Sequence, residues 1–195
     1  MKERPILFSA PMVRALLDGT KTQTRRVVKP QPDSISPDGI PARFFHQRAI
    51  GSGYPVQIRS PYGQLGDRLW VRETWQAVRG DDRARHICTS PRPDVGWIEY
   101  AATPREDEPA YKWRPSIHMP RWASRIDLEV TGVRIERLQD ISEADARAEG
   151  YDIGPPPCID DPVRWYRYLW EQLNGAGSWD ANPWVWVVMF RRARP

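Results

Sequence analysis

The chain has 195 residues, of which 40% are hydrophobic and 28% are charged, and its 29 basic and 25 acidic side chains give a formal net charge of +4. This composition is typical of a globular domain with its own core. The longest apolar run covers only residues 184–190, far below the roughly 20 residues of a membrane helix, and the amino terminus lacks the apolar stretch of a signal peptide. We therefore expect a cytoplasmic protein with no membrane partner.

Cysteine and histidine are too scarce and too scattered to predict a zinc site or a disulfide framework. The two cysteines are Cys88 and Cys158, and the three histidines are His46, His86 and His118. We expect no metal, no cofactor and a reducing compartment.

The basic residues are almost all arginine. Only Lys2, Lys21, Lys29 and Lys112 are lysines, so 25 of the 29 are arginines. A GC-rich coding genome is one explanation. Recognition of phosphate, and hence of RNA or DNA, is the other, because the planar guanidinium matches phosphate oxygens.

The first third of the chain predicts a strand, a helix and a second strand. Residues 4–8 have the composition of a short strand, and Pro11 and Gly19 frame a two-turn helix with apolar residues at helical spacing. Residues 21–28 are rich in β-branched side chains, which favours a turn running into a strand.

The middle of the chain contains two long polar insertions. Residues 30–66 carry six prolines and little periodicity, and residues 79–112 contain only one clear strand candidate, at 97–100. We interpret both as loop insertions into one domain that spans residues 1–195. Between them, residues 68–75 are predicted to form a strand after the turn at Gly66.

The last third shows the clearest patterns. Apolar residues alternate from Ile126, with a bulge expected at Gly132. Ser142 and Asp145 have the spacing of a capping box, which predicts a helix that ends at Gly150. A further helix is expected after Asp161, and the continuous apolar run 184–190 predicts a buried central strand.

Strands outnumber helices in this order, and no regular alternation of strand and helix occurs. The sequence therefore predicts an α+β fold built on a small, mixed, partly open β-barrel, with about three short helices and two long loop insertions.

The junction between the first helix and the second strand carries a recognisable motif. Its residues are Gly19, Lys21, Thr24 and Arg26, in a pattern that resembles G-x-K-x-x-E-x-R of the ASCH domain family, with threonine in place of glutamate as in one enzymatic branch. The surrounding elements follow the family's order, and the long, tryptophan-rich form is similar to bacteriophage and prophage versions. The resemblance implies a PUA-like fold for the framework of the chain but not for its insertions.

The branch with threonine includes small amidohydrolases that deacetylate 4-N-acetylcytidine with a Lys, Thr and Glu trio. Matched residue by residue, Lys21 and Thr24 are the first two members. The resemblance places the glutamate late in the helix after Ser142, which implies Glu149, and Glu143 and Glu73 are the alternatives.

These residue types suit amide hydrolysis. A threonine hydroxyl needs a base to become a nucleophile, and a lysine amine serves only when uncharged. Desolvation must therefore lower the lysine pKa by several units from about 10.4. The competing interpretation is structural: Lys21 and Thr24 would satisfy the last carbonyls of a helix and favour the following strand.

Five further residues are candidates for binding the substrate. Arg26 holds the arginine position of the motif, and the others lie in or near aromatic segments: Glu73, Trp75, Trp113 and His118. The run 113–122 is dense in aromatic and basic residues and could stack on a base. Core packing is the alternative for each tryptophan, and a structural role is the alternative for Arg26.

Three functions remain open. The first is a hydrolase that removes an N-acyl group from a modified pyrimidine nucleoside or nucleotide, with Thr24 as nucleophile, Lys21 as base and Glu149 as acid or base. The second is a non-catalytic RNA- or DNA-binding module, and the third is a metal-independent ribonuclease.

Overall fold

The structure is a computed structural model that describes residues 1–46, 53–78, 97–104, 112–151 and 159–193. Its helices in these ranges are α1 (Ala10–Asp18), α2 (Glu143–Ala148) and α3 (Pro162–Asn174). The described ranges also contain three short 3₁₀ turns, at Ser116–His118, Arg121–Ala123 and Leu138–Asp140. No helix in the described ranges is both long enough and apolar enough to cross a membrane.

The main sheet has five strands in the order β1-β6-β9-β10-β2. Their bounds are β1 Glu3–Leu7, β6 Arg68–Arg72, β9 Asp127–Arg137, β10 Trp184–Arg192 and β2 Gln23–Val27. β1 and β6 are parallel, and every other pair is antiparallel. The expected α+β class is confirmed, but the strands in the described ranges do not close into a barrel. β1 and β2 are the two free edges.

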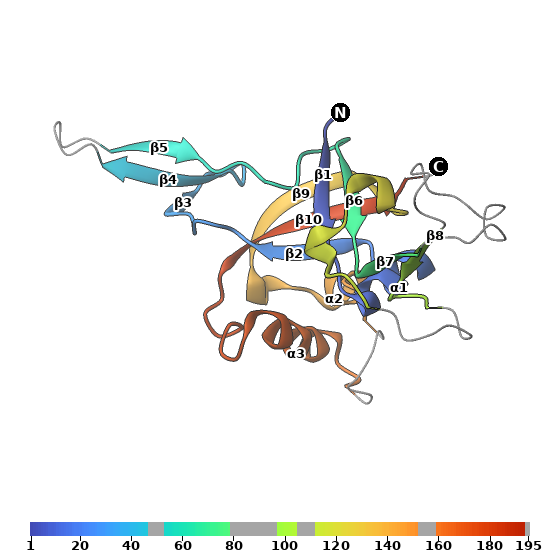
Figure 1. Ribbon diagram of the computed structural model, residues 1–195. Helices are drawn as coiled ribbons and strands as arrows, with labels where there is room; N and C mark the ends of the chain where they lie inside the picture. The colour runs from blue at the N-terminus through green and yellow to red at the C-terminus, as the bar shows by residue number, and fades with distance from the viewer. Residues whose placement is uncertain (47–52, 79–96, 105–111, 152–158, 194–195) are drawn as a thin grey trace.

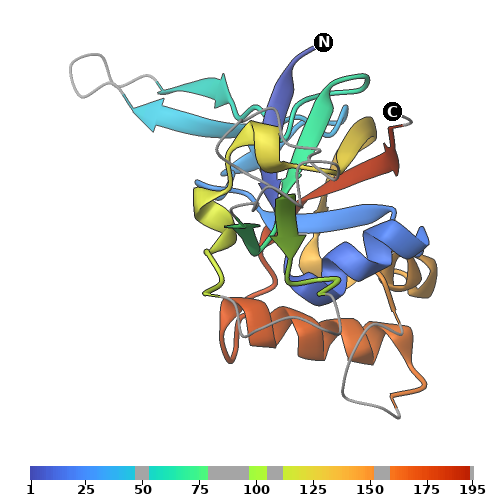
Figure 2. The ribbon, with the colours of Figure 1, turned by 45° about the vertical axis from the view of Figure 1, so that its right-hand side comes forward.

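The predicted loop 30–66 contains strands as well. β3 (Ser34–Ile35), β4 (Pro41–His46) and β5 (Gly53–Gln57) form an antiparallel sheet, and β4 and β5 project from the body as an arm in both views (Figures 1 and 2). The prolines in this segment made strands difficult to predict from the sequence. Proline is nevertheless tolerated at the first residue of a strand and in edge strands, and Pro41 begins β4 while Pro55 lies in the edge strand β5.

The predicted strand 68–75 is interrupted. β6 ends at Arg72, and the chain re-enters regular structure as β7 (Trp75–Val78), which pairs with β8 (Trp97–Tyr100) in a separate sheet. The break occurs because Trp75 exchanges backbone hydrogen bonds with Arg114 instead of continuing the main sheet. The strand expected at 97–100 is confirmed, and most of the second insertion lies outside the described residues.

The bulge expected at Gly132 is confirmed. The register of β9 against β10 passes from Gly132 opposite Met189 to Val130 opposite Phe190, which leaves Thr131 unpaired. A Cβ atom at position 132 would meet Met189 Cε, the flexible end of that side chain, so glycine leaves room for the Met189 side chain beside the bulge.

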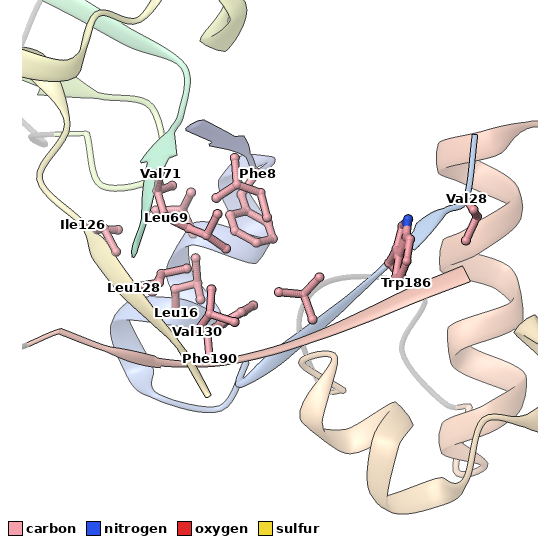
Figure 3. Close-up of a cluster of buried hydrophobic side chains, with 14 residues drawn as sticks. Phe8, Leu16, Val28, Leu69, Val71, Ile126, Leu128, Val130, Trp186 and Phe190 are labelled. Carbon is pink, nitrogen blue, oxygen red and sulfur yellow. The ribbon is translucent and has the colours of Figure 1, made fainter. Parts of the chain in front are cut away.

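The two faces of β10 bury separate hydrophobic clusters. Val185 and Val187 pack with α2 and α3, whereas Trp186, Val188 and Phe190 pack on the side of α1. Figure 3 shows the α1-side cluster drawn out along β10, with Trp186 and Val28 at one end. α3 runs beneath the sheet near β2 in both ribbon views (Figures 1 and 2).

Candidate functional site

The loop between α1 and β2 connects two helix ends. The Lys21 N–H donates to Ala15 O of α1 at 3.1 Å, and the Thr22 N–H donates to Ala148 O of α2 at 2.9 Å. The Gln23 side-chain amide donates to Asp145 O, also on α2. These residues therefore satisfy carbonyls of both helices. The structural interpretation of the motif expected this of Lys21 and Thr24, but the bonds to α2 come from Thr22 and Gln23.

The Lys21 amine is fully buried and bound to Glu149. It donates to Glu149 O at 2.8 Å and to Glu149 Oε2 at 2.9 Å, and the exposed fractions of the two side chains are 0% and 3%. Within the described part of the chain the amine makes no third hydrogen bond. Glu149 follows directly on α2, and its own N–H is bonded to Asp145 O, so the helix end fixes both acceptors.

Burial lowers the pKa of Lys21 from its usual 10.5, and the opposing charge and hydrogen bond of Glu149 offset this only in part. The nearby Arg26 and Arg25 charges add to the lowering. The uncharged form of the amine is therefore easier to reach here than in water.

Thr24 lies on the α1 side of the sheet. It pairs with Val188 of β10, which packs in the α1-side cluster, and its side chain lines a cavity while the residue as a whole is 3% exposed. The Lys21 amine lies 5.7 Å from the centre of the Phe8 ring, which belongs to the same cluster. The Lys21 amine and Thr24 therefore both lie near the α1-side cluster, and no hydrogen bond joins them among the described residues.

Arg25 points to the opposite side and holds a group of carboxylates. Its buried guanidinium lies 3.1 Å from Glu136 and from Asp145 and 3.3 Å from Glu149 Oε1. Glu149 therefore has one carboxylate oxygen on Lys21 and the other on Arg25, and its orientation is fixed from both sides.

The cavity has a volume of about 710 Å³. It lies at the open side of the main sheet, where the end of β1 meets the free edge of β2 and where α3 supplies a wall. The residues that line it are Leu7, Phe8, Ser9, Met12, Thr24, Arg25, Arg26, Val27, Lys29, Pro61, Tyr62, Thr74, Ser116, Glu149, Tyr166, Leu169, Trp170, Leu173, Asn174 and Trp186. Its size is that of a small-molecule site.

Arg26 spans the gap between the two free edges. Its Nη2 donates to Leu7 O at 2.6 Å, and its guanidinium carbon lies 5.4 Å from the centre of the Phe8 ring. This side chain therefore links β2 to β1 where no backbone pairing does.

The structure separates the candidate carboxylates. Glu73 is buried, but it forms two hydrogen bonds with Arg125, at 2.9 and 3.0 Å, and does not line the cavity. Glu143 is exposed in the first turn of α2. Of the three candidates, Glu149 is the one that contacts Lys21.

The remaining predicted binding residues do not line the cavity either. Trp75 is buried in a separate cluster with Met119, and its ring packs edge-on against Trp122. Trp113 is half-buried, and His118 is exposed. Ser116 is the single cavity residue from the aromatic run 113–122 that the structure describes.

A different set of aromatic residues forms the wall: Phe8, Tyr62, Tyr166, Trp170 and Trp186. The spacing of Tyr166 and Trp170 on one face of a helix and the place of Trp186 in the last strand were visible in the sequence. Both patterns indicated burial, and nothing in them indicated a cavity.

Within the described ranges, no group of three or more His, Cys, Asp or Glu side chains is arranged to hold a metal ion. Comparison of the chain with models of protein families, with curated proteins and with solved structures gave no match.

Proposed function

We propose that the cavity beside Thr24 is the active site of a hydrolase that removes an N-acyl group from a cytidine-type nucleoside or nucleotide. In this proposal the sheet is the framework of a partly open PUA-like barrel of the ASCH type, as the motif at Gly19, Lys21, Thr24 and Arg26 suggests. Arg26 would then act as a structural link across the open side.

The observation that carries the proposal is that two of the three groups line one cavity and the third is bonded to one of them. Thr24 and Glu149 line it, and the Lys21 amine, which does not itself line the cavity, is buried behind Glu149 and bonded to its carboxylate. A hydroxyl, an amine and a carboxylate are the groups that acyl transfer requires.

The hydrogen bonds of Lys21 suit a base. An uncharged amine has two N–H groups and one lone pair, and the bonds to Glu149 O and Oε2 use both N–H groups. The lone pair remains free to accept the Thr24 proton, and burial of the amine favours this uncharged form.

The reaction then proceeds in two balanced steps. Thr24 Oγ attacks the acyl carbon while its proton passes to Lys21, the bond between the acyl carbon and the exocyclic nitrogen breaks, and the nitrogen leaves with that proton. Water then hydrolyses the threonine ester, which releases the carboxylic acid and restores the hydroxyl. Glu149 orients the amine throughout and stabilises its protonated form.

The test is acetate release from 4-N-acetylcytidine by the wild type and two matched variants. Thr24→Val removes the proposed nucleophile without changing side-chain volume, and Thr74→Val removes a second threonine hydroxyl that lines the same cavity. We expect Thr24→Val to lose activity by a factor of about 10³ or more, as loss of a nucleophile does, while Thr74→Val keeps most of it. Equal activity of the two variants would contradict the assignment of Thr24.

Two results would favour the other functions. Absence of turnover by the wild type, together with tight and salt-sensitive RNA binding, favours a nucleic-acid-binding module. Degradation of RNA that disappears in Lys21→Ala favours a ribonuclease.

A further inference from the structure

The charges that line the cavity are unbalanced. Three of its lining residues are cations, namely Arg25, Arg26 and Lys29, and one is an anion, Glu149. Arg25 is compensated by three carboxylates, and Glu149 by Lys21 and Arg25. In the described part of the chain, no acidic side chain pairs with Arg26 or Lys29. The cavity therefore presents two cations that no described acidic side chain neutralises.

Arg26 also has unused hydrogen-bond donors. Its bond to Leu7 O uses one of its five N–H groups, and its Nε is buried without an acceptor. A buried donor on a charged group normally finds a partner. The guanidinium therefore keeps free N–H groups at a residue that lines the cavity.

Neutral donors line the cavity with these cations. The Ser9 side chain makes no capping bond to α1, and Tyr62 lines the same cavity. Burial raises the pKa of Tyr62, with partial opposition from the Arg26 charge, so the phenol keeps its proton at neutral pH and can donate it in a hydrogen bond. Two cations and neutral hydroxyls form a suitable environment for phosphate oxygens.

The residues that line the cavity differ in their exposure to solvent, which indicates how deep in the cavity each one lies. Thr24 and Glu149 are buried, Arg26 is half-buried, and Lys29 is exposed. A ligand that presents its reacting group to Thr24 would therefore have its charged end near Arg26 and Lys29. The cavity volume of about 710 Å³ is within the range for small ligands, which favours a single nucleotide over a strand.

We propose that Arg26 and Lys29 form a phosphate subsite at the mouth of the cavity, so that the ligand is a free cytidine-type 5′-mononucleotide rather than a nucleoside. This inference builds on the proposed function, which supplies the base and the reacting group. The phosphate adds affinity and holds the acylated base against Thr24.

Calorimetric titration of the wild type with 5′-CMP and with cytidine tests the subsite without any turnover, because neither compound carries an acyl group. We expect CMP to bind about tenfold more tightly, which corresponds to about 1.4 kcal/mol, because the phosphate gains charged hydrogen bonds that cytidine cannot make. The advantage should shrink as salt increases. Equal affinity for the two compounds would overturn the proposal.

Lys29→Gln is the informative variant, because Lys29 is exposed and its loss does not threaten the fold. Lys2→Gln is its matched control: Lys2 is also exposed, lines a second cavity, and its loss changes the net charge equally. We expect the preference for CMP to fall severalfold in Lys29→Gln and to persist in Lys2→Gln. The same loss in both variants would mean that bulk charge, not a subsite, attracts the phosphate.

A short oligoribonucleotide with an internal cytidine is the last arm. Lys29-dependent binding of this strand in the absence of CMP binding would overturn the mononucleotide assignment. The subsite and the hydrolase are tested separately: Lys29-dependent CMP binding without release of acetate from 4-N-acetylcytidine or its 5′-phosphate would support the subsite and reject the hydrolase. Hydrolysis of 4-N-acetylcytidine and of its 5′-phosphate with equal kcat/KM would support the hydrolase and reject the subsite.

Discussion

Lys21 and Glu149 are ionisable side chains that the fold buries against one another, at 2.9 Å between Nζ and Oε2. A buried ion pair has a large desolvation cost, so that removal of one partner is far more damaging than removal of both. The proposed role of Lys21 as a base depends on this burial. Burial costs desolvation free energy, but it also lowers the pKa of Lys21 and so makes the amine easier to deprotonate.

The pair predicts a non-additive result in a double-mutant cycle. Lys21→Met leaves a buried carboxylate without its partner, and Glu149→Gln leaves the buried amine without its carboxylate, so each single variant should lose about 3–5 kcal/mol of unfolding free energy. The double variant should lose clearly less than the sum of the two. Urea unfolding of the four proteins measures the coupling, and simple additivity would mean that the two side chains do not interact in solution.

At the scale of residues, the motif spacing predicted that Lys21 and Thr24 belong together, and both residues are buried. The contribution of Arg25 could not be predicted, since its three carboxylate partners come from positions 136, 145 and 149. Nothing local to residue 25 indicates that a strand and a helix more than 100 residues away will supply them.

Among the elements, α3 forms one wall of the cavity and depends on its amino-terminal cap. The Asp161 carboxylate accepts hydrogen bonds from the Val163 and Arg164 N–H groups, at 2.8 and 3.0 Å. Tyr166 and Trp170 then face the cavity from the next turns. The first turn of α3, and with it the orientation of this wall, is therefore stabilised by Asp161, which does not line the cavity.

Loss of this cap should destabilise the protein by about 1 kcal/mol in Asp161→Ala, the usual effect of removing an N-cap residue. Asp160→Ala is the control, because it removes the same charge from the neighbouring exposed position. Chemical denaturation of both variants measures the difference, and equal losses would assign the effect to charge near the helix end rather than to the cap.

Elements whose start or end is determined by residues nearby in the sequence could be predicted from the sequence. Elements that depend on pairing with other segments could not. The capping residue Ser142, which accepts the Asp145 N–H at 3.1 Å, and the bulge beside Gly132 both depend on neighbours in sequence. The strands β4 and β5 depend on pairing across a hairpin, and proline conceals their pattern. The predicted strand 68–75 was wrong at its end, because Trp75 pairs with Arg114 and not with a strand of the main sheet.

Across the whole molecule, a charge network connects the sheet to α2. Arg25 of β2 and Arg134 of β9 both contact Asp145 of α2, and both also contact Glu136 of β9. β9 and α2 follow one another in the chain, but β2 lies about 100 residues earlier, so the network joins distant parts of the sequence. The packing of these elements also places Glu149 at the cavity.

The network predicts a specific loss of stability in acid. Burial raises the pKa of Asp145, but the Arg25 charge and the hydrogen bonds from Ser142 and Arg134 outweigh this effect and lower the pKa to about 2, against an ordinary value of 3.8. A folded-state pKa below the unfolded value means that the ionised carboxylate stabilises the fold above pH 3.8, and that this contribution disappears as the pH falls toward 2.

Asp145→Asn should therefore be less stable than the wild type near neutral pH and should lose less additional stability between pH 4 and pH 2. Asp140→Asn, at an exposed position just before α2, should keep the wild-type pH dependence. Urea midpoints measured across this range for the three proteins provide the comparison. If the urea midpoint of Asp145→Asn falls with pH as much as that of the wild type down to pH 2, another carboxylate causes the acid sensitivity. The charge of Asp145 then does not stabilise the packing of α2 on the sheet.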